Sequence, residues 1–123
     1  MQQLIYVFIG GGIGSSLRYL IGLSLNKDTI PYGTLTVNVL GSLLIGILMG
    51  YYMRSGNSQL SNNQIAFIAV GIFGGFTTFS SFMYENLQFL INQQYFRFVG
   101  YSLLSIALGF LMVFMGFLIG ERI

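Results

Sequence analysis

The chain of 123 residues contains no cysteine and no histidine, and only 7% of its residues are charged. Without cysteine and histidine there is no thiolate nucleophile, no disulfide, no imidazole base and no Cys/His zinc site. A nucleophile with its base cannot be assembled from such a chain in the usual way, so we expect no enzyme activity. The formal net charge of +2, with no basic run, argues against nucleic acid as a partner.

What the sequence has instead is apolar surface, since hydrophobic residues make up 54% of the chain. A soluble domain of this size needs more charge, whereas lipid solvates an apolar exterior. Four stretches reach the roughly 20 residues that cross a bilayer: 4–25, 32–53, 64–91 and 96–119. They are continuous rather than alternating, which predicts helices rather than barrel strands. We therefore expect an all-α integral membrane protein, a single four-helix domain over residues 1–123 surrounded by membrane lipid.

The basic residues are divided evenly between the two sides that four spans define. Arg54 and Arg122 lie on the side of the termini, and Lys27 and Arg97 lie on the other. The positive-inside rule then has no bias on which to act. Two interpretations stay open: one weakly determined orientation, or a chain that inserts both ways and pairs as an antiparallel, dual-topology homodimer. The small size favours the dimer, because two copies supply eight helices around a water-filled path.

Each predicted span contains two glycines four residues apart, a spacing that lets helices approach closely. The pairs are Gly10/Gly14, Gly46/Gly50, Gly71/Gly75 and Gly116/Gly120. Because the chain has 17 glycines, the same spacing also arises by chance. On its own it is weak support for close helix packing.

Polar residues inside a span are costly in hydrocarbon, and each needs a physical reason. Arg18, in the first span, either extends its side chain to the nearer interface or places a fixed positive charge in an aqueous vestibule that attracts anions. Thr34 and Asn38, in the second span, lie one turn apart on the same face. Asn38 either forms a hydrogen bond to a neighbouring helix or offers its amide N–H groups to a passing anion.

The middle of the third predicted span is poor helix material. Residues 74–82 read GGFTTFSSF, so two glycines precede two β-branched threonines. A break here would free backbone groups that lipid cannot satisfy, and such breaks commonly place carbonyl groups around a cation. The alternative is a glycine patch that serves only packing.

Aromatic, hydroxyl and acidic side chains follow this predicted break. Phe79 and Phe82 share a helix face and either pack in the core or turn their positive ring edges toward a small anion. Ser81 and Glu85 lie on a neighbouring face. Glu85 is the only acidic residue well inside a span, and it either carries a proton or pairs with a hydroxyl.

The fourth span carries a stripe of hydroxyl groups. Tyr101, Ser105 and Gly109 recur every four residues, so the stripe ends in a small gap at Gly109.

Three segments together resemble the Fluc (CrcB) family of fluoride-specific ion channels: residues 10–19 (GGGIGSSLRY), 33–38 (GTLTVN) and 74–82 (GGFTTFSSF). With four spans of this length, the likeness covers nearly the whole chain. It implies a fluoride-selective channel for passive fluoride efflux, which lowers fluoride toxicity, in the cell (inner or plasma) membrane of a prokaryote. It further implies an antiparallel dual-topology homodimer with two pores and a structural sodium ion at its centre, bound by the backbone carbonyls of Gly75 and Thr78.

The resemblance also implies roles for individual side chains. The residues expected to contact fluoride are Asn38, Phe79 and Phe82. The hydroxyl track expected beside them consists of Thr34, Ser81, Tyr101 and Ser105, and the vestibule charge is Arg18. Ser81 stands where threonine is common and keeps the hydroxyl, whereas Gly109 lacks the hydroxyl that some relatives have there.

Two other functions compete with a channel. A small multidrug carrier also has four helices and dual topology, but it needs a membrane-embedded carboxylate early in the chain, and here only Glu85 could serve. A membrane scaffold that transports nothing would show no fluoride conductance in liposomes.

Overall fold

A computed structural model describes residues 1–27, 29–56 and 59–123. In chain order its elements are α1 (Gln2–Leu25), β1 (Asn26–Lys27), β2 (Ile30–Pro31), α2 (Tyr32–Arg54), α3 (Asn62–Ile65), the π-helix η1 (Ala66–Phe73), α4 (Gly74–Phe76), α5 (Phe79–Ile91) and α6 (Tyr95–Arg122). Within these residues, four helical stretches are long and apolar enough to cross a membrane: Gln2–Leu25, Tyr32–Arg54, Asn62–Ile91 and Tyr95–Arg122. The prediction of an all-helical protein with four spans is confirmed. The helices run a few residues beyond the apolar stretches, because polar residues continue each helix toward the interface.

The third span is a composite of several helical segments. It begins with a capping box, in which Ser61 Oγ accepts from the Gln64 amide and Gln64 Oε1 accepts from the Ser61 amide. The π-helix η1 follows, and at its end the Gly74 amide donates to the carbonyl of Ala69, five residues earlier. Such widened turns often occur near functional sites. The sequence does not signal the π-helix, because an unbroken apolar run has no periodicity that distinguishes it from an α-helix.

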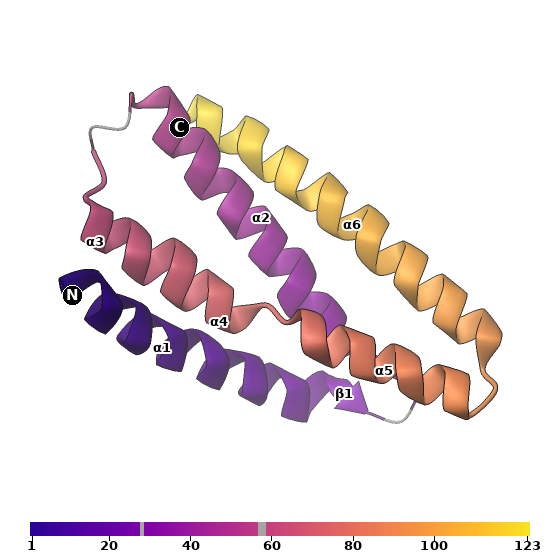
Figure 1. Cartoon of the computed structure of the whole chain (residues 1–123). Helices are drawn as coiled ribbons and strands as arrows, with labels where there is room; N and C mark the ends of the chain where they lie inside the picture. Colours follow the sequence, from indigo (N-terminus) through magenta and orange to yellow (C-terminus); the bar gives the residue numbers. More distant parts are fainter. Residues whose placement is uncertain (28, 57–58) are drawn as a thin grey trace.

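The helices pack as two pairs, α1 beside the segment from α3 to α4 and α2 beside α6, with both termini at the same end (Figure 1). Glycines form the seam of the first pair. A Cβ atom built on Gly71 would lie 2.9 Å from Gly10 Cα, and one on Gly75 would lie 2.6 Å from the Gly11 carbonyl oxygen. These backbones touch because no side chain separates them.

The seam between α2 and α6 uses the other two glycine pairs. A Cβ atom on Gly46 would lie 3.1 Å from Gly116 Cα, and one on Gly50 would lie 3.1 Å from Gly120 Cα. Each of the four predicted glycine pairs therefore packs against another: the pair of α1 against that of the third span, and the pair of α2 against that of α6. The spacing that was weak support in the sequence marks the main packing surfaces of the fold.

The connection between α1 and α2 is a short hairpin in which Asn26 of β1 pairs with Pro31 of β2. The Asn26 amide donates to the Gly22 carbonyl and ends α1. The Asn26 side chain then serves the next helix, because its Oδ1 accepts from the amides of Gly33 (2.8 Å) and Thr34 (3.2 Å). These are first-turn amides of α2, which have no partner inside the helix.

The buried core is small and aromatic. Phe82, Phe89 and Tyr101 pack together, with Ile30 and Phe98 among the side chains against them. Most other large apolar side chains face outward, as lipid-facing side chains do in a membrane protein. Phe82 and Phe89 belong to α5, so this aromatic cluster follows the interruption of the third span along the chain.

Candidate functional site

The third span is interrupted at Thr77 and Thr78, close to its middle. Both residues are extended, with φ/ψ of −85°/159° at Thr77 and −152°/121° at Thr78. The Thr77 amide and its Oγ1 both donate to the Phe73 carbonyl, which closes the first part of the span. Thr78 Oγ1 accepts from the Ser81 amide at 3.2 Å and so caps α5. The interruption lies in the segment where the sequence predicts it.

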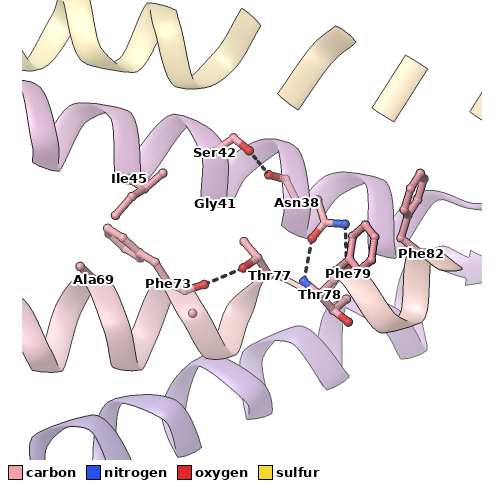
Figure 2. A pocket seen from close by; sticks show the side chains of 11 residues that line it. Asn38, Gly41, Ser42, Ile45, Ala69, Phe73, Thr77, Thr78, Phe79 and Phe82 are labelled. Carbon is pink, nitrogen blue, oxygen red and sulfur yellow. Dashed lines mark hydrogen bonds between the residues drawn. The ribbon is translucent and has the colours of Figure 1, made fainter. Parts of the chain in front are cut away.

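Asn38 of α2 binds the peptide groups that the interruption frees. Its Oδ1 accepts from the Thr78 amide (2.7 Å), and its Nδ2 donates to the Thr78 carbonyl (3.0 Å), as Figure 2 shows. The side-chain amide thus replaces the helical partners that an extended residue lacks. Of the two roles considered for Asn38, the bond to a neighbouring segment is present. Because Nδ2 carries two hydrogens, a second N–H remains for another acceptor.

A cavity of about 400 Å³ lies beside this pair, lined by Ser42, Thr77, Phe79 and Phe82 among others (Figure 2). The two phenylalanine rings are 6.2 Å apart and tilted by 47°. They differ in environment: Phe82 is 7% exposed and lies 5.2 Å from the Tyr101 ring, whereas Phe79 is 73% exposed. Both rings line the cavity, but Phe82 is a buried core residue, whereas Phe79 is largely exposed on the surface of the single chain.

A second cavity, of about 530 Å³, lies on the other side of the interruption. Arg18 is half-buried and lines it together with small polar residues, among them Ser15, Thr34, Ser80 and Ser81. Among the described residues that line this cavity, Arg18 carries the only charge, and its guanidinium contributes a positive potential. Thr78 lines both cavities. The interruption therefore lies between the cavity that contains Arg18, called the vestibule below, and the aromatic cavity.

Glu85 accepts two hydroxyl hydrogen bonds. Thr34 Oγ1 of α2 donates to its Oε1, and the Tyr101 hydroxyl of α6 donates to its Oε2 at 2.9 Å. Thr34 and Tyr101 are 4% and 5% exposed, so the carboxylate meets buried donors. Of the two roles considered for Glu85, pairing with a hydroxyl is present, and two helices supply the partners.

The remaining hydroxyl residues of the predicted track occupy separate positions. Ser81 Oγ accepts from Thr78 Oγ1 at 3.1 Å, on the vestibule side. Ser105 Oγ is buried and has no hydrogen-bond partner within the described part of the chain. A buried hydroxyl without a protein partner calls for water or an ion.

The sequence of this chain matches a protein family and several named relatives. Residues 5–117 match the family described as CrcB-like protein, Camphor Resistance (CrcB). The chain belongs to the CrcB family. A relative named "Fluoride-specific ion channel FluC" from Gloeothece citriformis is 40% identical over 126 residues, which cover 99% of each chain. The FluC proteins of Phocaeicola vulgatus and Bacteroides fragilis are 39% and 41% identical to this CrcB-family chain, over 98% and 99% of its length and 100% and 98% of theirs.

The CrcB-family chain has two polar residues at this site that sequence reasoning passed over. Ser42 lies one turn after Asn38 and donates to its carbonyl at 2.7 Å. A Cβ atom on Gly109 would lie 3.7 Å from Ser42 Oγ, so the α2 hydroxyl stands opposite the gap in the α6 stripe. The four-residue spacing of Thr34, Asn38 and Ser42 could have revealed this residue. Asn26 gave no comparable signal, because it caps a helix that starts six residues later.

Proposed function

We propose that this protein is a fluoride-selective channel through which fluoride leaves the cell passively. Its CrcB-family relatives carry the name of fluoride-specific ion channels, at about 40% identity over nearly the whole chain. As a member of a family of ion channels with four apolar spans, it is a multi-pass membrane protein and not an enzyme. Those relatives are bacterial, which supports a prokaryotic origin.

One observation on the chain itself supports this function most strongly: the interruption at Thr78 lies between a positive vestibule and an uncharged aromatic cavity. Fluoride holds its water tightly, so a pore must replace that water with donors and still release the ion. The second N–H of Asn38 and the ring edges of Phe79 and Phe82, which line the aromatic cavity, are donors of this kind. None of the described residues that line the aromatic cavity is charged, so none of them would trap an anion.

The assay for this function is fluoride release from liposomes. Purified protein is reconstituted in vesicles loaded with potassium fluoride, a potassium ionophore is added, and a fluoride electrode records the efflux. We expect rapid release of fluoride and none of chloride from vesicles loaded with potassium chloride. Vesicles that retain fluoride would contradict the channel and favour a membrane scaffold.

Three variants separate the channel from a proton-coupled carrier. In a channel, Phe79→Ile and Phe82→Ile slow fluoride release because the ring edges are lost. A carrier that uses Glu85 as its proton site would instead lose transport in Glu85→Gln and keep it in both phenylalanine variants. That pattern would replace the channel with the carrier.

The proposed assembly is an antiparallel, dual-topology homodimer. The even distribution of basic residues supports it, as does Phe79, which one subunit leaves 73% exposed. Because the chain has no cysteine, a single cysteine in Asn92→Cys reports the orientation of the loop that joins α5 and α6. We expect a membrane-impermeant thiol reagent to label about half of the protein from each side. Labelling from one side only would contradict dual topology.

The proposed structural sodium ion at the dimer centre would be held by the carbonyl oxygens of Gly75 and Thr78. These oxygens fit a sodium ion in kind: both are at the interruption, where discontinuous helices commonly expose carbonyls to a cation. Thr78 O accepts from Asn38 Nδ2 at 3.0 Å, and Gly75 O lies 3.5 Å from Ser15 Oγ, so each oxygen lies beside a polar side chain of a neighbouring helix. One chain supplies two such ligands, which fits a site completed by a second copy.

Sodium removal tests this site through stability as well as flux. We expect the thermal midpoint in detergent to fall when sodium is replaced by N-methylglucamine, and to recover with sodium but not with potassium. An equal midpoint in all three salts would contradict a structural sodium ion.

A further inference from the structure

Both the oxygen and the nitrogen of the Asn26 side-chain amide form hydrogen bonds at the start of α2. Its Oδ1 accepts from the Gly33 and Thr34 amides, and its Nδ2 donates to Thr34 Oγ1 at 3.3 Å. The Thr34 hydroxyl, which accepts from Asn26, donates to Glu85. A hydroxyl has a single hydrogen, so these bonds set the direction in which the Thr34 hydroxyl points.

Thr34 behaves differently from several other hydroxyl residues of the spans. Side chains of this kind commonly donate to the carbonyl four residues earlier in the helix. Among the described residues, Ser16, Ser24 and Ser42 do so inside helices, and Thr77 does so just after α4. Thr34 instead bonds across to Glu85 of α5. Thr34 is the third residue of α2, and Ile30, four residues earlier, belongs to β2, so the helix offers it no such carbonyl.

Asn26 also stands between the vestibule and Glu85. It lines the cavity that contains Arg18. It lines as well two openings that reach Glu85, one of about 190 Å³ beside Phe89 and one of about 550 Å³ beside Tyr84. In the proposed channel, an anion in the cavity with Arg18 meets Asn26 and Thr34 in its lining, and Thr34 is bonded to Glu85.

We propose that Asn26 is a positioning residue of the anion path, which acts by directing the Thr34 hydroxyl to Glu85. This inference rests on the proposed channel function. A carboxylate beside an anion path opposes the anion unless donors hold it and offset its charge. Thr34 and Tyr101 are those donors, and Asn26 keeps Thr34 in place. Without the Nδ2 donor, the Thr34 hydroxyl loses the bond that fixes the direction of its hydrogen toward Glu85.

Two substitutions separate this role from helix capping. Asn26→Asp keeps an oxygen acceptor for the Gly33 and Thr34 amides but removes the donor to Thr34, whereas Asn26→Ala removes both. We expect Asn26→Ala to lower the thermal midpoint and Asn26→Asp to keep it, because an acidic group near a helix N-terminus is favourable. Both variants should slow fluoride release by roughly 3- to 10-fold, the effect of losing one hydrogen bond. Wild-type release from Asn26→Asp would overturn the proposal.

Two controls test whether Asn26→Asp slows fluoride release through the Thr34 hydroxyl. In a Thr34→Val background, Asn26→Asp should slow release no further, because the hydroxyl through which it acts is gone. The new carboxylate also adds charge at the vestibule, and salt screens an effect of that kind. An Asn26→Asp effect that disappears at high concentrations of an impermeant salt, or persists unchanged beside Thr34→Val, would overturn the proposal.

A spectroscopic measurement tests the positioning without any flux. The chain has two glutamates, Glu85 and Glu121, so ¹³C-labelled glutamate isolates their infrared carboxyl bands, and Glu85→Gln assigns one of them. We expect the Glu85 band to shift alike in Asn26→Ala and Thr34→Val, and not in Gln88→Ala, a neighbouring control. An unshifted band in Asn26→Ala would overturn the proposal. If wild-type vesicles retain fluoride, the channel function fails while this measurement still decides the role of Asn26.

Discussion

At the scale of the residue, the proposed channel relies on Asn38 for both its structure and its transport. Its amide is bonded to both peptide groups of Thr78, so it holds the interruption open. It also lines the aromatic cavity, where its remaining N–H is available to an anion. Packing and ion contact, which the sequence offered as alternatives, are compatible in one amide because Nδ2 has two hydrogens.

Replacing Asn38 with aspartate separates these contributions. Asn38→Asp loses the donor to the Thr78 carbonyl and places a negative charge beside the anion path. We expect fluoride release from liposomes to fall by at least about tenfold, the effect of leaving a half-buried acceptor unpaired and adding a repelling charge. The matched control Asn62→Asp adds the same charge at the exposed start of α3. Undiminished release from Asn38→Asp would remove Asn38 from the path.

The two phenylalanines should respond differently to the same substitution. Phe82 is packed against Tyr101, so Phe82→Ile should lower the thermal midpoint, at a cost of about 1–3 kcal/mol, as well as slow fluoride release. Phe79 is mostly exposed, so Phe79→Ile should slow release with little change in the midpoint. Paired melting and efflux measurements check this. Equal loss of stability in both variants would show that Phe79 is a packing residue.

At the scale of the element, the interruption depends on the cap of α5. Thr78 Oγ1 accepts from the Ser81 amide, and a cap of this kind contributes about 0.5–2 kcal/mol. Thr78→Val should therefore lower the thermal midpoint, and Thr78→Ser, which keeps the hydroxyl, should not. A Thr78→Val midpoint equal to that of the wild type would mean that Asn38 alone maintains the interruption.

The glycine seams make a prediction about helix pairs. A side chain at Gly46 would overlap the backbone of α6, where no flexible group is able to move away. We expect Gly46→Val to cost at least about 1–3 kcal/mol, which is typical of overpacking, and to lower the yield of folded protein. Gly100→Val is the matched control, because nothing lies within 4 Å of a Cβ atom there. Normal yield and stability of Gly46→Val, measured by size exclusion and melting in detergent, would contradict the seam.

At the scale of the whole molecule, lysine substitutions can change the balance of basic residues between the two sides of the membrane. Gln93→Lys with Gln94→Lys adds positive charge to the loop before α6, and Gln3→Lys with Gln59→Lys adds it on the opposite side. Each pair should force one orientation. We expect each alone to lose fluoride release and coexpression of the two to restore it. Full release from either alone would contradict an antiparallel dimer.

Much of this protein could be predicted from its sequence because membrane insertion depends on local properties. The length of an apolar run decides whether it spans lipid, and the Gly-Gly-Phe-Thr-Thr run from Gly74 to Thr78 disfavours an uninterrupted helix wherever it is placed. Thr34 and Tyr101 could be selected as polar residues that need a partner. The identity of that partner, Glu85, could not be read from spacing, because the three residues belong to three helices.

The sequence by itself determined the four spans, the place of the interruption and the set of polar residues that must find partners inside the membrane. Only the tertiary structure decided which glycine pairs meet, that Asn38 binds Thr78 and that Asn26 reaches Thr34. The physical reason is the distance along the chain over which each effect acts. Hydropathy and backbone propensity act over one helical turn or one span, whereas hydrogen bonds and close backbone contacts between helices depend on how those spans are packed.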